Sequence, residues 1–152
     1  MRHCRQPPAT IWHEYFLIDP TVTTPLATIL LIENDFDNIS IYTTILEYNG
    51  YGVVCAEDGV TGVELARSAH PDLIVMDISI PGIDGWEATR TIKADPRTAS
   101  IPILVLTVHA LDSDRQRAFE EGADGYMMKP AEPIQVVHEI RRMLSSGGGA
   151  PT

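Results

Sequence analysis

Four short apolar runs in this chain each end in a polar side chain of a kind used to move a phosphoryl group. These endings are Asp77 after 73–76, Glu33 and Asn34 after 29–32, Thr107 after 103–106, and Lys129 after 126–128. A carboxylate can accept a phosphoryl group when cations and hydrogen-bond donors neutralise the repulsion between the two anions. Asp77 is therefore the candidate nucleophile. Because ligands of an open parallel sheet bind outside the carboxyl ends of its strands, we expect these side chains to converge on one site.

The other polar residues supply what such a transfer requires. Lys129 can place an ammonium group on a phosphoryl oxygen, and the Thr107 hydroxyl and the backbone N–H groups after Asp77 can donate further hydrogen bonds. Mg²⁺ prefers oxygen ligands and keeps several waters, so few protein groups are needed to hold it. The candidate metal ligands are the carboxylates of Glu33 and Asp77, the side-chain oxygen of Asn34 and the carbonyl of Ser79.

The elements that must position these residues alternate along the chain from Thr28 onward. Short apolar runs predict strands at 28–32, 53–56, 73–76, 103–106 and 125–128. Amphipathic spacing and capping residues predict helices at 36–49, 59–69, 86–94, from 112 or 113 to 121, and at 134–145. The run 73–76 is apolar throughout, as a central strand buried on both faces should be. The alternation predicts an α/β fold with a five-stranded, doubly wound parallel sheet and helices on both faces.

Residues 28–145 account for one domain built from five strand–helix units. Residues 1–27 contain prolines at positions 7, 8, 20 and 25 and show no sustained periodicity, so we expect a disordered N-terminal arm. The alternative is that the aromatic side chains of Trp12, Tyr15 and Phe16 dock on the domain or on a partner. Residues 146–152 include three consecutive glycines and are expected to form a flexible tail.

The composition excludes several classes of protein. The 152 residues are 44% hydrophobic, which is enough for a full core. Lysine and arginine total 11 against 21 aspartates and glutamates, and the net charge of −10 argues against direct DNA binding. No apolar run reaches the length of about 18 residues that a membrane-spanning helix needs. Charged residues interrupt the apolar stretch near the N-terminus, so we read no export signal and expect a cytoplasmic protein.

Several stretches of the sequence together carry a family resemblance: 30–34, 71–77 followed by 81–85, 106–107, and 122–130. On these stretches, residues 28–145 resemble the receiver domain of bacterial two-component response regulators, and most closely the stand-alone, single-domain type. The resemblance implies the flavodoxin-like strand order 2-1-3-4-5. It also implies Asp77 as the phosphoacceptor, Lys129 as the lysine of the site, Thr107 as a hydroxyl switch and Tyr126 as an aromatic switch.

The resemblance further implies the partners of the domain. The phosphoryl group would come from a phosphohistidine on a sensor histidine kinase or a histidine phosphotransfer protein. Phosphorylation would then change contacts with a downstream protein target, without direct binding to DNA or to a membrane. No conventional reaction on an external substrate is expected, only self-phosphorylation from a phosphodonor, with Mg²⁺ as the cofactor, and slow autodephosphorylation.

One position departs from the family pattern at the metal site. The family normally carries two adjacent carboxylates after its first strand, whereas this chain has Glu33 followed by the neutral Asn34, which predicts weakened Mg²⁺ binding. Asp35 could compensate, but its position favours capping of the following helix. The alternative function is a pseudo-receiver, a binding module that signals without phosphorylation. A flavin or nucleotide binder of the same fold is disfavoured, because no glycine-rich phosphate loop follows the first strand.

Overall fold

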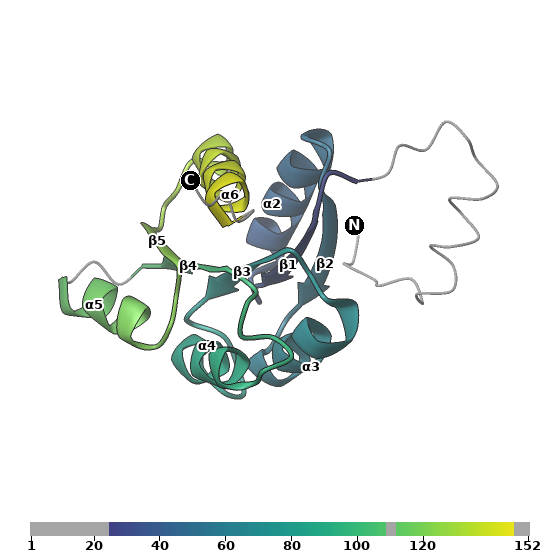
Figure 1. The fold of residues 1–152 in the computed structure, drawn as a ribbon. Helices are drawn as coiled ribbons and strands as arrows, with labels where there is room; N and C mark the ends of the chain where they lie inside the picture. The colour runs from purple at the N-terminus through teal and green to yellow at the C-terminus, as the bar shows by residue number, and fades with distance from the viewer. Residues whose placement is uncertain (1–24, 109–111, 148–152) are drawn as a thin grey trace.

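The computed structural model describes residues 25–108 and 112–147 and contains a five-stranded parallel sheet in the order β2-β1-β3-β4-β5 (Figure 1). The strands are β1 (Thr28–Ile32), β2 (Gly52–Ala56), β3 (Leu73–Asp77), β4 (Ile103–Thr107) and β5 (Gly125–Met128). The predicted fold class and strand order are therefore confirmed. Strands β3 and β4 each run one residue further than predicted, so Asp77 and Thr107 are the last residues of their strands.

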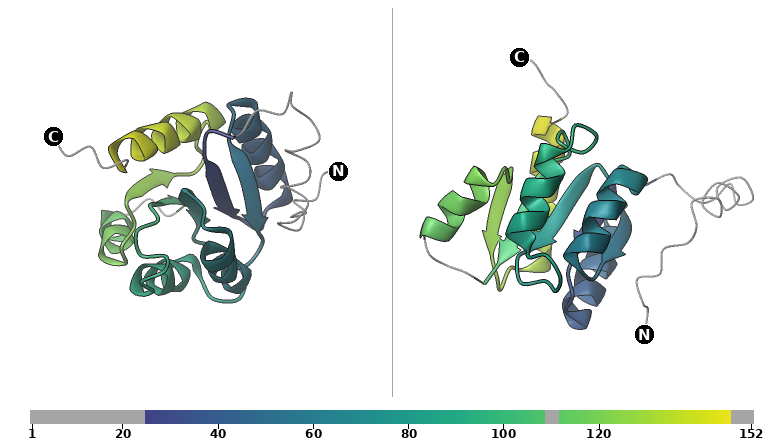
Figure 2. Two further views of the ribbon diagram at one scale, coloured as in Figure 1. Left: turned by 45° about the vertical axis from the view of Figure 1, so that its right-hand side comes forward. Right: turned by 90° about the horizontal axis from the view of Figure 1, so that it is seen from below.

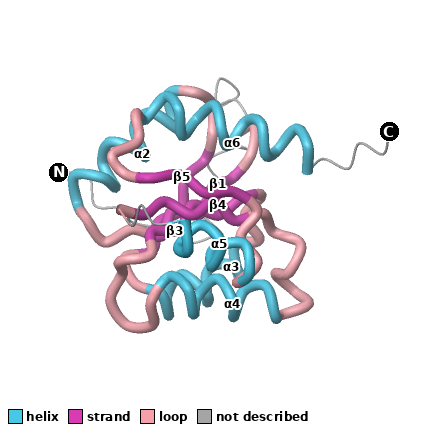
Figure 3. The backbone as a smooth tube through the Cα atoms, turned by 90° about the vertical axis from the view of Figure 1, so that its left-hand side faces the viewer, coloured by secondary structure: helices cyan, strands magenta, loops and turns pink. Residues whose placement is uncertain are grey.

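Helices cover both faces of the sheet. On one face lie α2 (Phe36–Tyr48) and α6 (Pro133–Gly147), and on the other lie α3 (Gly59–Ala69), α4 (Gly85–Ala94) and α5 (Asp112–Glu120), as Figures 2 and 3 show. Helix α6 begins one residue earlier than predicted and extends to Gly147, two residues beyond its predicted end. In the part of the chain that the structure describes, every helix is too short or too polar to cross a membrane.

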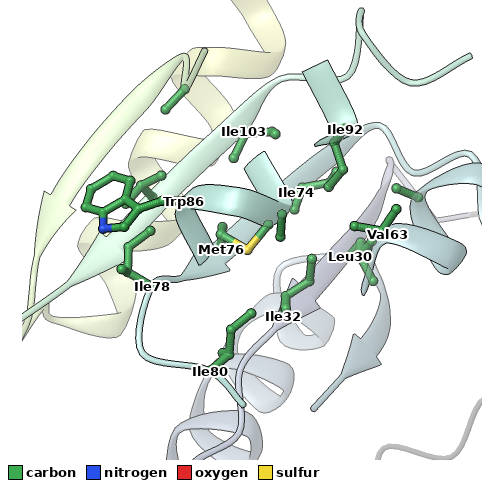
Figure 4. Close-up of a cluster of buried hydrophobic side chains, with 14 of the residues drawn as sticks. Leu30, Ile32, Val63, Ile74, Met76, Ile78, Ile80, Trp86, Ile92 and Ile103 are labelled. Atoms are coloured by element: carbon green, nitrogen blue, oxygen red, sulfur yellow. The ribbon is translucent and has the colours of Figure 1, made fainter. Parts of the chain in front are cut away.

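The strands separate two apolar cores because their side chains alternate between the two faces. Under α3, α4 and α5, the strands contribute Val105 and five residues that Figure 4 labels: Leu30, Ile32, Ile74, Met76 and Ile103. Under α2 and α6, they contribute Ile29, Leu31, Leu73, Val75, Leu104 and Leu106. This division explains why β1, β3 and β4 are apolar except for one polar residue at an end of each, since both faces of each strand are covered. Close packing on both faces limits the movement of the strands. The side chains at the carboxyl ends of the strands therefore start from fixed backbone positions.

Aspartates cap three of the helices. Asp35 before α2, Asp58 before α3 and Asp84 before α4 each accept a hydrogen bond from the backbone N–H three residues later, at 2.9, 2.7 and 2.9 Å. Such caps satisfy backbone donors that have no partner within the helix, and their negative charge suits the helix N-terminus. The predicted capping role of Asp35 is confirmed. Two of these caps, Asp35 and Asp84, fix the chain just after β1 and in the loop after β3.

The chain is tied to the sheet before β1 begins. Leu26 N donates to the carbonyl oxygen of Gly50, and Gly52 N donates to that of Ala27, both at 2.9 Å. Leu26 and Ala27, which the sequence assigned to the arm, therefore bond to the chain around β2. The predictions for the rest of the arm, with Trp12, Tyr15 and Phe16, and for residues 148–152 of the tail concern residues outside the described ranges.

Candidate functional site

Strand register brings the predicted residues together at the carboxyl edge of the sheet. The positions that lie level with each other are Ile32 and Met76, Asp77 and Leu106, and Thr107 and Met128. Glu33, Asp77, Thr107 and Lys129 thus lie at the ends of four neighbouring strands. Glu33 is 1% exposed, Asp77 7% and Thr107 0%, so three polar groups are buried at one edge of an apolar sheet. Buried polar groups need partners, and Glu33 and Asp77 share one in Lys129.

Lys129 joins strands that are far apart in the sequence. Its Nζ lies 2.9 Å from Glu33 Oε1 and 3.5 Å from Asp77 Oδ2. Its backbone N donates to the carbonyl oxygen of Thr107 at 2.8 Å, which continues the pairing of β4 with β5 past the end of β5. The backbone bond places the lysine beside β4, and the side chain then extends across β3 to reach β1.

Burial and the Asp77 carboxyl favour the neutral form of Glu33 and outweigh two hydrogen-bond donors that favour the charged form. Burial raises the pKa of its carboxyl, and the neighbouring Asp77 carboxyl raises it further, whereas hydrogen bonds from Lys129 and Asn38 lower it. The net result is a pKa of about 7. Burial would lower the pKa of Lys129, but its hydrogen bond to Glu33 and the charge of Asp77 outweigh this effect and raise it. Two carboxyl groups are therefore crowded together, and one ammonium group offsets them only in part.

The chain that follows β3 also contacts Asp77, both at its side chain and at its backbone. Its Oδ1 accepts a hydrogen bond from Ser79 N at 3.2 Å, which leaves Oδ2 toward Lys129. Gly85, the first residue of α4, donates from its N to the carbonyl oxygen of Ile78 at 3.1 Å. A methyl group at position 85 would lie 2.6 Å from the carbonyl oxygen of Asp77, closer than any side chain can come. Only glycine allows α4 to start so near the backbone of Asp77.

The two acids fit a divalent cation. Glu33 Oε2 is buried and has no hydrogen-bond partner among the described residues, an arrangement that is costly unless a cation or water satisfies it. Beside it stands the Asp77 carboxyl, so the site offers hard oxygen ligands of the kind Mg²⁺ takes. The other predicted ligands, Asn34 and Ser79, are solvent-exposed next to these acids in the chain. The structure thus brings two of the four predicted ligands together and leaves the other two at the rim.

The site offers few acidic side chains as metal ligands. Among the described residues, no group of three or more His, Cys, Asp and Glu side chains is arranged to hold a metal ion. A cation bound by Glu33 and Asp77 alone would therefore keep most of its coordination sphere as water, which Mg²⁺ accepts readily because it dehydrates reluctantly.

The two predicted switch residues lie on adjacent strands and on the same face. Tyr126 is level with Val105 in the pairing of β4 with β5, and it packs against the core under α3, α4 and α5 that contains Val105. Thr107 follows Val105 by two residues, so its side chain points to this same face. Burial raises the pKa of the Tyr126 phenol, and the charge of Asp114 on α5 raises it further. Both residues therefore lie on the α5 side of the sheet.

Two residues of α2 belong to the site although the sequence analysis did not single them out. Asn38 Nδ2 donates to Glu33 Oε1 at 2.6 Å. Tyr42 is buried, and burial raises the pKa of its phenol, with a lowering contribution from Lys129 and raising contributions from Glu33 and Asp77. Their spacing could have indicated this, because residues 38 and 42 lie four apart on one face of a helix that starts just after β1.

Comparisons with known proteins cover the strands and helices that form this site. Residues 29–141 match the family described as response regulator receiver domain. The chain is 33% identical to Protein PilH of Pseudomonas aeruginosa over 120 residues, which are 79% of this chain and 99% of PilH. It is 30% identical to the polar-differentiation response regulator DivK of Brucella ovis over 117 residues, which are 77% of this chain and 95% of DivK.

Solved structures share the fold. The receiver domain of a sensor histidine kinase from Pseudomonas aeruginosa, described with a magnesium ion coordinated in the active site cleft, has a TM-score of 0.73 and 32% identity and covers 78% of this chain and 98% of its own. The chemotaxis response regulator CheY4 of Vibrio cholerae has a TM-score of 0.74 and 26% identity, with coverage of 78% and 98%. The chain therefore belongs to the response regulator receiver domain family of two-component signalling.

Proposed function

We propose that this domain accepts a phosphoryl group from a phosphohistidine donor onto Asp77 and thereby switches its contacts with other proteins. The observation that carries the proposal is the buried cluster in which Lys129 lies between Glu33 and Asp77. It joins a nucleophilic carboxylate, a cation for the phosphoryl oxygens and a second acid suited to a metal ion. The donor would be a sensor histidine kinase or a histidine phosphotransfer protein in the cytoplasm.

In the transfer, a carboxylate oxygen of Asp77 attacks the phosphorus atom while the bond from phosphorus to the donor's imidazole nitrogen breaks. The imidazole keeps the electron pair, and the product is an acyl phosphate on Asp77. Ser79 N donates to Oδ1 of Asp77, whereas Oδ2 faces Lys129, and we therefore assign the attack to Oδ2. Slow attack of water on the phosphorus atom later breaks the new P–O bond and restores the carboxylate.

Each residue of the site has a part in this reaction. Mg²⁺, when bound, would neutralise charge on the phosphoryl oxygens. Glu33 and Asp77 would hold it, with the Asn34 side chain and the Ser79 carbonyl as further ligands from the rim. Lys129 would pair with one phosphoryl oxygen, and the Thr107 hydroxyl would donate to another.

The placement of Thr107 and Tyr126 on one face of adjacent strands supports a switch between two states. When the Thr107 hydroxyl moves toward the phosphoryl group, Tyr126 moves into the space it leaves, and a pre-existing equilibrium between two states shifts. The surface that changes is formed by α5, β5 and α6, where the downstream protein target would bind. The output is a protein contact and involves no direct DNA binding.

A second candidate function is a pseudo-receiver that signals without phosphate. Two observations favour it. Asn34 supplies no charge for a metal ion, and Lys129 lies nearer to Glu33 than to Asp77. The intact Asp77, Thr107 and Lys129 favour the phosphorylated form.

Intact-mass measurement after incubation with acetyl phosphate and Mg²⁺ tests the proposal. We expect one added phosphoryl group on the wild-type protein and on Asp37→Asn, an exposed position on α2, and none on Asp77→Asn. An adduct that persists in Asp77→Asn would contradict the assignment of the acceptor. No adduct on the wild type, with acetyl phosphate or with a phosphorylated histidine phosphotransfer protein, would instead favour the pseudo-receiver.

A further inference from the structure

Asn38 extends from α2 to Glu33, the acid proposed to hold the metal ion. It stands in the first turn of the helix, where its backbone N donates to the Asp35 cap at 2.9 Å. Its side-chain Nδ2 donates to Glu33 Oε1 at 2.6 Å. The Cα–Cβ bonds of a helix tilt toward its N-terminus, so a side chain in the first turn naturally points back at the end of the preceding strand. The Asp35 cap therefore fixes the direction from which Asn38 approaches Glu33.

The two oxygens of Glu33 have very different surroundings. Oε1 accepts from both Asn38 Nδ2, at 2.6 Å, and Lys129 Nζ, at 2.9 Å. Oε2 is buried and has no partner among the described residues. With Lys129 alone, the carboxylate could turn and offer either oxygen to the flexible ammonium group. Two donors from different directions fix which oxygen is occupied and which stays available.

We infer that Asn38 is a positioning residue: it holds Glu33 in the orientation that leaves Oε2 available to a divalent cation. The inference rests on the proposed function, because it concerns the cation that assists phosphorylation of Asp77. Partners of metal ligands commonly set ligand orientation in this way, and their removal typically costs about tenfold to a hundredfold in metal affinity.

An amide suits this role because it donates a hydrogen bond without adding charge. An aspartate at position 38 would repel Glu33, and a lysine would cancel the negative charge that attracts the cation. The amide leaves the charge of Glu33, Asp77 and Lys129 unchanged while it restricts the geometry. This matters more in a site where Asn34 contributes no charge, since the few charged ligands present must be well placed.

Calorimetric titration of the metal-free protein with Mg²⁺ tests the inference. We expect Asn38→Ala to raise the dissociation constant about tenfold and Asn38→Gln, which keeps an amide donor, to restore part of the loss. The matched control is Asn49→Ala, which removes an amide hydrogen bond to the carbonyl oxygen of Ile45 at the other end of α2. This control should leave the dissociation constant unchanged, although it also weakens the helix. If Asn38→Ala does not fold, Asn38→Ser replaces it, because serine suits the first turn of a helix but is too short to keep the same contact.

The outcomes separate this inference from the proposed function. A dissociation constant for Asn38→Ala within twofold of the wild-type value, with measurable binding by the wild type, would overturn the role of Asn38 and leave the proposed function standing. A wild-type protein that binds no Mg²⁺ would overturn both. Equal losses in Asn38→Ala and Asn49→Ala would show that weakening of α2, and not the contact with Glu33, lowers the affinity.

Discussion

Lys129 Nζ lies closer to Glu33, at 2.9 Å, than to Asp77, at 3.5 Å. In this state the lysine therefore mainly neutralises Glu33, the proposed metal ligand, and Asp77, the proposed phosphoacceptor, receives the weaker contact. A cation that binds at Glu33 would compete with the ammonium group for that acid. We expect this competition to free Lys129 for the phosphoryl oxygens, so that the cation and the lysine act in sequence on neighbouring groups.

Lys129→Met should destabilise the metal-free protein by about 3 kcal/mol, because breaking a buried ion pair leaves an uncompensated charge. Both carboxyls are nearly buried, so water cannot fully replace the ammonium group. Urea unfolding at pH 8 measures the loss. The control, Arg142→Met, removes an exposed cation that pairs with Glu139 on α6 and should cost far less. Equal losses in the two variants would show that the cluster does not depend on its lysine.

The stability of the metal-free protein should fall as the pH rises toward neutrality. Glu33 has a pKa of about 7 in the folded protein against an ordinary value of 4.5, so the folded state binds the proton more tightly than the unfolded state. The stabilisation that comes from this tighter proton binding at Glu33 is fully present below about pH 4.5. It is lost as the pH rises through 7 and the folded protein releases the proton. The loss amounts to about 3 kcal/mol, since each pKa unit corresponds to about 1.4 kcal/mol.

Urea unfolding at a series of pH values, with wild type and Glu33→Gln side by side, checks this pH dependence. The glutamine keeps the shape of the side chain and does not titrate, so the difference between the two curves isolates Glu33. Parallel curves between pH 5 and 8 would contradict the raised pKa. Because a cation would take the place of the proton, Mg²⁺ affinity of the wild type should also increase over this range.

Asn34→Asp should tighten Mg²⁺ binding by about tenfold to a hundredfold, or roughly 1.4 to 2.8 kcal/mol. The change adds a third carboxylate beside Glu33 and Asp77 and should also speed phosphorylation. The metal-free protein should become slightly less stable, because like charges are brought together, but position 34 is exposed and water screens most of this repulsion.

Thr44→Asp serves as the control for Asn34→Asp, because it adds the same charge at an exposed position further along α2. Only a small change in Mg²⁺ affinity is expected there. Equal affinities of the wild type and Asn34→Asp would place Asn34 outside the coordination shell. Asp35 is not a ready substitute, since its side chain already accepts from Asn38 N.

A chain that begins at Pro25 should keep the melting temperature of the full chain. The two hydrogen bonds of Leu26 and Ala27 with the chain around β2 are retained in it, and so is the whole sheet. Differential scanning calorimetry of both forms measures the difference. A loss of many degrees would show that Trp12, Tyr15 or Phe16 contributes to the stability of the domain.

The sequence was sufficient to predict where the site forms, because polar residues that end four parallel strands must meet at one edge. It was also sufficient to assign the cap at Asp35. It did not predict the contact of Asn38 with Glu33, since that contact depends on how α2 is rotated after its cap. The earlier start of α6 could have been predicted, because Pro133 suits the first position of a helix, where no N–H is required.

The sequence also did not predict which of the two acids Lys129 contacts more closely, for a different reason. The distances from Lys129 Nζ to the nearest oxygens of Glu33 and Asp77 differ by less than 1 Å, and a small change in one flexible side chain would reverse which is shorter. Residue types and spacing do not carry that information. The roles of the site residues in phosphorylation therefore remain predictions for the experiments above.

Gly85 lets α4 begin against the backbone of Asp77, and α4 then buries Trp86, Ala88, Thr89 and Ile92. Among the described residues of α5, which lies on the same face of the sheet, only Ala118 is buried. A segment with few buried contacts is displaced more easily than one with many. We therefore expect a group bound at Asp77 to move α5 further than α4.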